Sequence, residues 1–130
     1  MKESNFQFTD PSLTYIQFKE NKDFAIVKNK EIEIETNINV SNTKTSDTQA
    51  TVAIRISIGS TANTSPFILE AEFMANFRWK EELEHENVEL LLKQNAPALL
   101  LSYARPIISM ITNASHFPAY NIPFINFTER

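Results

Sequence analysis

The sequence predicts an α+β fold: a four-stranded antiparallel sheet with one long helix packed on one face. Apolar and polar residues alternate along residues 31–40, 48–58 and 67–79, and a long, largely apolar helical pattern follows over 84–113. Alternation with period two is typical of antiparallel strands that bury one face and leave the other in water. At 130 residues the chain has room for one hydrophobic core, so we expect a single domain over residues 1–130.

The four predicted strands differ in the strength of their pattern. Residues 31–40 are the clearest, because Ile32, Ile34, Ile38 and Val40 share one face. Residues 67–79 carry apolar or small residues at every odd position from Phe67 to Trp79. Residues 13–19 are the weakest, because their apolar residues alternate only in part. The polar stretches 41–47 and 59–66 are short enough to join neighbouring antiparallel strands. The longer, charged stretch 20–30 fits a crossover between the first two strands.

The predicted helix over 84–113 is apolar almost all the way around its axis. Such a helix needs cover on two sides, and we expect the sheet to supply one and a second subunit the other. Pro106 lies inside the pattern and predicts a kink, because proline removes one backbone hydrogen bond and clashes with the preceding turn. The residues predicted to pack the helix in the domain or the oligomer are Leu100, Tyr103, Ala104, Ile107, Ile108 and Ile111.

Composition excludes several classes of function. The net charge is −4 and the isoelectric point is about 5.2, whereas proteins that bind nucleic acid need a basic surface. The chain has no cysteine for disulfides or thiolate chemistry, and its one glycine, Gly59, cannot form a glycine-rich phosphate loop. The first ten residues lack the apolar core of a signal peptide, and no apolar run approaches the ~18 residues that cross a membrane. We therefore expect a cytoplasmic protein that binds no nucleic acid and does not insert into membranes.

The C-terminal quarter carries the most specific pattern in the chain. Prolines there forbid helix, so the segment after the helix should run extended or in turns. The pattern consists of Tyr103-Ala104-Arg105 within the helix, then Phe117-Pro118, Asn121, Pro123 and Ile125-Asn126-Phe127. The order and spacing of these residues resemble the closing signature of the SecB family of protein-export chaperones.

The resemblance implies a fold and a function. SecB-type chaperones have a four-stranded antiparallel sheet with a long helix on one face, and they assemble as dimers of dimers, that is, as homotetramers. They need no cofactor and catalyse no reaction. The function expected for this chain is that of a holdase, which binds unfolded or pre-export polypeptides and keeps them unfolded for export.

The resemblance also implies a docking face for the SecA translocation motor. Family members contact SecA through an apolar residue and a glutamate two positions later on the wet face of the fourth strand, and Ile68 and Glu70 match them here. The family's acidic positions on the first strand correspond to Tyr15 and Lys19, which departs from the pattern. The family usually continues past Asn-Phe into a second helix and an acidic end, whereas this sequence ends at Arg130. A SecB-like chaperone dedicated to one client, such as an antitoxin, is therefore the alternative function.

A holdase needs exposed apolar side chains, because large exposed apolar patches are typical of interaction sites. Apolar residues at strand ends, in the crossover and in the proline-rich tail are the best candidates for such exposure. The predicted client-binding residues are Phe18, Phe24, Phe77, Trp79, Tyr120, Ile122 and Phe124.

Other functions compete with this interpretation. The same fold can serve an interaction protein that binds one folded partner. A sheet wrapped on a helix also describes hotdog-fold thioesterases, which normally need glycines near the thioester. His85 lies among glutamates and His116 follows Ser115, but neither pattern has the spacing of a metal site or a catalytic triad. We expect no enzymatic activity, no cofactor and no metal.

Overall fold

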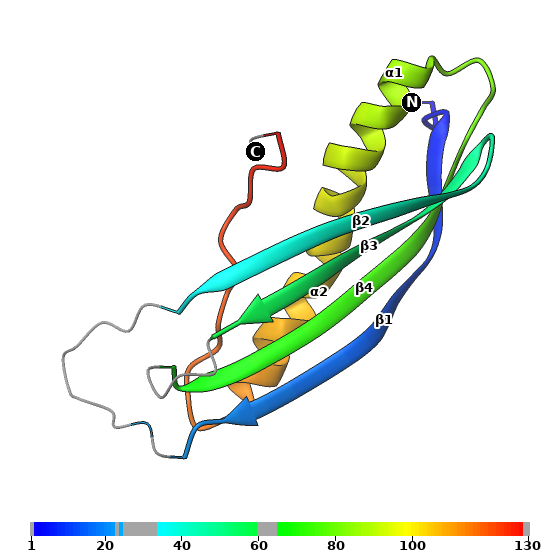
Figure 1. The fold of residues 1–130 in the computed structure, drawn as a ribbon. Coiled ribbons are helices and arrows are strands. Elements are labelled where there is room, and N and C mark those ends of the chain that lie inside the picture. The colour runs from blue at the N-terminus through cyan, green and yellow to red at the C-terminus, as the bar shows by residue number, and fades with distance from the viewer. Residues whose placement is uncertain (1, 23, 25–33, 60–64, 129–130) are drawn as a thin grey trace.

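The computed structural model describes residues 2–22, 24, 34–59 and 65–128 of the chain. One antiparallel sheet forms a layer, a long helical segment covers one of its faces, and the C-terminal tail returns along this helix (Figure 1). The strands are β1 (Phe6–Glu20), β2 (Thr36–Ser46), β3 (Gln49–Ile58) and β4 (Phe67–Trp79), in the sheet order β1-β4-β3-β2. The helical segments are α1 (His85–Leu90), the π-helical turn η1 (Leu91–Asn95) and α2 (Ala96–Asn113). The predicted fold class is confirmed.

The helix-facing side of the sheet is the hydrophobic core. The odd-numbered residues of β4, from Phe67 to Trp79, are buried, and so are the even-numbered residues of β3 from Ala50 to Ile58. These two rows pair with each other across the strands, and paired residues point to the same face. The period-two pattern of the sequence therefore identified this surface correctly.

Helix α2 buries one stripe of side chains against this surface. Leu100, Ala104 and Ile108 recur every four residues, so they lie on one side of the helix, and none of them is exposed. These three predicted packing residues thus belong to the core of their own chain. The other three are only partly covered, and they are Tyr103, Ile107 and Ile111.

The hairpin between β2 and β3 is tighter than the sequence predicted. The prediction ended the strand at Val40 and assigned residues 41–47 to a loop, and this is wrong, because β2 continues to Ser46. A turn at Asp47 and Thr48 then leads into β3. The end of β2 is polar because an edge strand needs few apolar side chains, and threonine favours extended backbone. The start of the predicted second strand, residues 31–33, lies outside the described residues.

Strand β1 begins at Phe6, well before the predicted start at residue 13. Asp10 and Pro11 interrupt the alternation of the sequence, and they fall where the pairing of β1 with β4 shifts. Asp10 has a φ of 55°, a left-handed conformation that accommodates such an irregularity. The strand therefore passes through a bulge that a search for regular alternation does not recognise.

The helical segment departs from α geometry just before Pro97. The backbone amide of Ala96 donates to the carbonyl of Leu91, five residues earlier, which closes the π-helical turn η1. Proline has no amide hydrogen and clashes with the carbonyl four residues before it, so the wider turn relieves crowding there. Pro106, predicted to kink the helix, lies inside α2, which continues to Asn113.

Gly59 follows β3 at a position that only glycine fits. Its φ of 83° is rarely adopted by residues with side chains, and a Cβ atom there would lie 2.2 Å from the carbonyl oxygen of Phe67. Its amide donates to the carbonyl of Glu35 at 2.8 Å. Glu35 and Gly59 are thus a hydrogen-bonded pair. Because such pairs alternate along an antiparallel ladder, every second residue of β2 counted from Glu35 forms hydrogen bonds with β3.

We predict that Leu100→Ala lowers the free energy of unfolding by about 2–5 kcal/mol, because it opens a cavity at a fully buried site. Leu90→Ala is the matched control, since Leu90 is 52% exposed, and it should cost less than about 1 kcal/mol. Urea unfolding followed by circular dichroism measures both values. Equal losses would mean that α2 does not face the sheet as described.

Candidate functional site

Arg105 anchors the C-terminal tail to α2. Its Nε donates to the carbonyl of Ile122 at 3.2 Å, and its Nη2 donates to the carbonyl of Pro123 at 2.9 Å. The guanidinium carbon also lies 5.5 Å from the ring centroid of Phe124. The planar fork of arginine suits two neighbouring carbonyl groups. Arg105 of the Tyr-Ala-Arg pattern thus binds the backbone of the proline-rich segment at Ile122 and Pro123.

Thr112 and Tyr120 form a second anchor for the tail. The backbone amide of Tyr120 donates to the Thr112 hydroxyl at 2.7 Å, and that hydroxyl donates to the carbonyl of Ile108 at 2.9 Å. The Tyr120 hydroxyl lies 2.5 Å from the hydroxyl of Thr36 on β2. The buried Thr112 hydroxyl is therefore satisfied, and the tail is tied both to the last turn of α2 and to an edge strand.

Aromatic rings pack around Phe67 where the tail begins. The ring centroid of Phe117 lies 6.4 Å from Phe67 and 6.1 Å from Phe24. Phe18 lies 5.5 Å from Phe67, and Tyr120 lies 6.4 Å from it. Tilted and edge-on arrangements at these distances are favourable. Three of the predicted client-binding residues, Phe18, Phe24 and Tyr120, are therefore half-buried in this aromatic cluster.

Three other predicted client-binding residues are buried, so the expectation that they are exposed is wrong. Phe77 is 2% exposed, Ile122 is 4% exposed and Trp79 is 8% exposed. Phe77 and Trp79 lie on β4, an inner strand, and Phe6 of β1 stacks on Phe77 at 5.4 Å. Ile122 is held inward where Arg105 binds its carbonyl.

Phe124 is the one predicted client-binding residue that the structure leaves fully open, since it is 98% exposed. It follows Pro123, whose carbonyl Arg105 holds. The ring of Phe124 thus lies in solvent, while Arg105 holds the backbone of the two preceding residues, Ile122 and Pro123, in place.

Exposed apolar side chains also lie on the opposite side of α2 from the tail. Successive helical residues are rotated by about 100°, so Tyr103 and Arg105 point in nearly opposite directions. Met110 shares the side of Tyr103, and the two residues are 66% and 41% exposed. Tyr103 meets Phe8 of β1 edge-on at 6.2 Å. This side of α2 therefore faces β1.

Strand β1 adds two exposed apolar residues on the same side of the sheet. Leu13 pairs with Phe73 and Ile16 pairs with Ala71, both of which are buried under the helix. Leu13 is 39% exposed and Ile16 is 38% exposed, because β1 is an edge strand. We call Leu13, Ile16, Tyr103 and Met110 together the open apolar face.

The face of the sheet that points away from α2 carries a charge network around Arg55. Its guanidinium lies 3.1 Å from the carboxylate of Glu70, 3.6 Å from that of Glu72 and 4.4 Å from the ring centroid of Tyr15. The hydrogen bond to Glu70 raises the pKa of Arg55. Glu70, the predicted docking carboxylate, is therefore paired within its own sheet, and Ile68 is partly exposed on the same strand.

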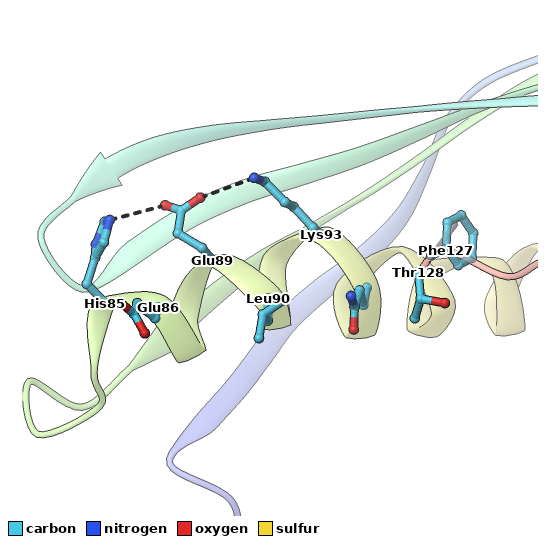
Figure 2. A pocket seen from close by; sticks show the side chains of 8 residues that line it. His85, Glu86, Glu89, Leu90, Lys93, Phe127 and Thr128 are labelled. Atoms are coloured by element: carbon cyan, nitrogen blue, oxygen red, sulfur yellow. Dashed lines mark ion pairs between the residues drawn. The ribbon is translucent and has the colours of Figure 1, made fainter. Parts of the chain in front are cut away.

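A pocket of about 300 Å3 opens between α1 and the end of the tail (Figure 2). Glu89 forms ion pairs along the helix with His85 at 3.8 Å and with Lys93 at 3.9 Å (Figure 2). Leu90 and Phe127 add apolar surface to the lining. Glu89 is thus shared between two neighbours on the helix, and exposed pairs of this kind contribute little to stability.

His116 joins the tail to the end of β1. Its backbone amide donates to Glu20 Oε1 at 2.6 Å, and its Nδ1 lies 2.8 Å from Glu20 Oε2. The backbone hydrogen bond, with the imidazole contact second, lowers the pKa of Glu20 below its ordinary value of 4.5. Ser115 is turned to the backbone instead and donates to the carbonyl of Thr112 at 2.6 Å. Ser115 and His116 are therefore not paired with each other as nucleophile and base.

The described part of the chain contains neither a metal site nor a membrane-spanning helix. No three residues of the types that bind metals lie close enough there to hold an ion. No helix there combines the length and hydrophobicity that a bilayer crossing requires.

Several surface residues were not predicted from the sequence. The contact between Arg55 and Tyr15 joins β3 to β1 across β4, and only the strand order brings these residues together. Leu13 and Ile16 were recognised as strand residues, but their exposure depends on β1 being an edge. Phe6 and Phe8, which cover the end of β4, carry a detectable signal, since they alternate with the polar Gln7.

The geometry defines a class of protein: an α+β domain with one helix on an antiparallel sheet and exposed apolar side chains on both sides of that helix. The family model described as "Preprotein translocase subunit SecB" matches residues 8–129, and the chain belongs to the SecB family. The protein-export protein SecB of Anaplasma phagocytophilum is 35% identical over 80 residues, which cover 59% of this chain and 51% of that protein. The SecB of Desulfotalea psychrophila is 29% identical over 100 residues, which cover 75% and 64%. The chain thus spans about half to two-thirds of the curated relatives that it matches.

Two solved structures share the fold. One is a SecB-like chaperone of Mycobacterium tuberculosis in complex with a ChAD peptide from the HigA1 antitoxin, with a TM-score of 0.72 and 14% identity over 92% of this chain and 90% of that one. The other is a protein of unknown function from Streptococcus agalactiae, with a TM-score of 0.53 and 11% identity over 92% and 97%. At these identities the likeness establishes the SecB-like fold.

We predict that Arg105→Ala releases the tail from α2. The change removes two hydrogen bonds to a charged donor, so amide exchange in the segment 114–128 should accelerate by about tenfold or more. Hydrogen–deuterium exchange read by mass spectrometry measures this. Arg78→Ala, at an exposed position of β4, is the control and should leave the tail unchanged. Unaltered exchange in the Arg105 variant would contradict the anchor.

We predict a loss of stability at acid pH that depends on Glu20. Folding lowers the pKa of this carboxylate, so the unfolded chain binds the proton more readily than the folded one. The contribution is therefore complete above about pH 4.5 and is lost as the pH falls through the lower, folded pKa. Urea unfolding should show wild type and Glu20→Gln differing at neutral pH and converging in acid. A gap that stays constant across the titration would refute this, and Glu81→Gln at an exposed turn is the control.

Proposed function

We propose that this chain is a holdase chaperone, which binds non-native polypeptides through exposed apolar surface and keeps them unfolded for export. Membership of the SecB family supports the proposal, since both matched curated relatives are named protein-export proteins. The single observation that carries it is the apolar surface left uncovered on both sides of α2, the open apolar face on one side and Phe124 on the other. The protein would act as one domain in the cytoplasm, without catalysis or cofactor.

The energetics of such a surface fit a holdase. Covering about 500 Å2 of apolar client surface contributes on the order of 12 kcal/mol before costs. Ordering a flexible client offsets most of this gain. The affinity that is left is modest and depends little on client sequence, which is what a chaperone for many unfolded chains requires.

The proposal includes assembly into dimers of dimers. The part of α2 that its own sheet leaves uncovered bears a row of apolar residues, and a second subunit that covers part of this row would remove them from water. Size-exclusion chromatography with light scattering separates a tetramer from smaller species. The residues of this row are Tyr103, Ile107, Met110 and Ile111.

A dedicated client is the second candidate function, and two observations favour it. Glu70, the expected SecA contact, is paired with Arg55, while Tyr15 and Lys19 stand at the places where the resemblance implies acidic residues. A structural neighbour is a SecB-like chaperone bound to an antitoxin peptide. In this alternative the chain would guard one client, such as an antitoxin, and would not dock on SecA.

We predict that Phe124→Ser weakens binding of an unfolded test protein by roughly fivefold, because a fully exposed ring lost from a client contact is worth about 1 kcal/mol. Stability should not change, and Phe124→Leu should keep most of the affinity. Light scattering of a denatured enzyme diluted into buffer reports suppression of aggregation. A wild type that fails to suppress aggregation at one oligomer per enzyme chain would contradict the holdase function.

We predict that Arg55→Gln strengthens binding to SecA by about three- to tenfold, because it frees the Glu70 carboxylate for a basic partner. The double variant Arg55→Gln with Glu70→Gln should return to the wild-type level. Pull-down with purified SecA, quantified over a range of salt concentrations, measures both. Strong wild-type binding that Glu70→Gln abolishes would instead favour the export role.

A further inference from the structure

Arg78 is a cation without a partner on the polar face of the sheet. Its side chain points away from α2, because the residues on either side of it in β4 are buried under the helix. Among the described residues, no carboxylate forms an ion pair with Arg78, and no protein group accepts a hydrogen bond from its guanidinium. Arg55, on the same face, is by contrast engaged with two glutamates. The donors of Arg78 are therefore directed to solvent.

The side chains that surround Arg78 on this face are neutral. In the register of the sheet, Arg78 lies opposite Gln7 on β1 and opposite Gln49 on β3. Asn76, two residues earlier on β4, lies opposite Thr9 on β1. Residues that pair across antiparallel strands point to the same face, so these four side chains share the face of Arg78. None of them carries a charge that would neutralise the guanidinium.

A pocket of about 230 Å3 opens beside Arg78, near the hairpin between β2 and β3. All four strands contribute to its lining. Its lining contains one cation and no carboxylate. We call it the Arg78 pocket, and its polar residues are Thr9, Thr45, Gln49, Asn76 and Arg78.

The lining of the Arg78 pocket is rich in hydrogen-bond donors. The Oδ1 atom of Asn76 accepts from the hydroxyl of Thr51 at 3.0 Å, which leaves the Nδ2 group of Asn76 to donate. The side-chain amide of Gln49 and the threonine hydroxyls can donate as well. The planar fork of an arginine matches the two oxygens of a carboxylate. The donor set of the pocket therefore suits a carboxylate better than a neutral or positively charged group.

The acidic residues that are near the lining in the sequence do not enter the pocket. Asp47 and Glu81 line a separate pocket together with Trp79, a residue of the helix-covered face. Asp10 lies where the pairing of β1 with β4 shifts, and it is not among the lining residues. The pocket therefore presents a single charge to a ligand, that of Arg78.

We propose that the Arg78 pocket binds the carboxylate of an aspartate or glutamate side chain on a polypeptide partner. One cation balances one carboxylate, whereas a phosphate group carries about −1.5 to −2 charges and would keep an excess. A polypeptide has a single terminal carboxylate, so acidic side chains are its more abundant source of this group. Helix α2 covers the opposite face of the sheet and does not block access (Figure 1). The site is thus separate from the apolar surfaces of the proposed holdase, which lie beside α2.

A titration followed by NMR tests the proposal on the wild-type protein. The probe is the tripeptide Ala-Glu-Ala, acetylated and amidated so that the glutamate carries its only charge. It should cause saturable shifts of the Nε–H signal of Arg78 and of the side-chain amides of Gln49 and Asn76. The matched peptide with glutamine at its centre should bind about tenfold more weakly, because it cannot form a hydrogen bond through a charged acceptor. Equal binding of the two peptides overturns the proposal.

Two variants that each remove one positive charge locate the binding site. Arg78→Gln should weaken binding of the glutamate peptide by about tenfold or more. Lys19→Gln is the matched control, since Lys19 is exposed and pairs with Ile68 at the far end of β4. It should change the affinity by less than about twofold, because salt screens charges that lie more than about 8–10 Å apart. Circular dichroism establishes that both variants are folded. Equal losses in the two variants would indicate general electrostatic attraction and would overturn the site.

Two further probes at constant ionic strength identify the ligand. One is acetylated Ala-Ala-Ala with a free C-terminal carboxylate, and the other is inorganic phosphate. Tighter binding of the free C-terminus than of the glutamate peptide assigns the pocket to a chain end and overturns the side chain as its occupant. Tighter binding of phosphate overturns the carboxylate. No saturable shift with any probe overturns the site altogether, and it leaves the holdase function standing, since suppression of aggregation is measured separately.

Discussion

The structure depends on the fit between one stripe of α2 and the inner surface of β3 and β4. Leu100, Ala104 and Ile108 have no exposed area, and burial of apolar surface at about 25 cal/mol per Å2 is the main force that holds a helix on a sheet. This contact also fixes the rotation of α2 about its axis. Tyr103 is thereby turned toward β1 and Arg105 toward the tail. The uncovered aromatic surface and the anchored tail are two consequences of the same packing.

The tail shows why an arginine is needed inside an apolar helix. The proline-rich tail runs extended, and its described residues belong to no strand whose ladder would bind their carbonyl groups. Arg105 supplies donors to two consecutive carbonyls, and Thr112 accepts the amide of Tyr120. Ile122 can then lie in the core while Phe124 remains in water. Fixed backbone on both preceding residues keeps an exposed ring in place, which lowers the entropy lost when that ring is bound.

The sequence predicted correctly those strands that have a neighbouring strand on each side and the helix above them along their whole length. β3 and β4 are flanked by strands and covered by the helix, so their alternation matched their burial at every position from Phe67 to Trp79. The prediction failed at the edges, where β2 is polar to its end and β1 passes through a bulge at Asp10. It also took Phe77 and Trp79 for exposed strand ends, because the early part of β1 that covers them was not recognised. The pairing of Arg55 with Glu70 depends on strand order, which local patterns do not contain.

The distortion of the edge strand β1 has a consequence for solubility. Chains with two regular edges can stack edge to edge without limit, since each added copy exposes a fresh template, and the product is an insoluble fibre. Here the β2 edge of one copy would meet, on the next, a strand distorted at Asp10 and Pro11. Such a junction cannot repeat over the full strand, so polymer growth ends early. The distorted edge of β1 therefore opposes edge-to-edge polymerisation of this chain.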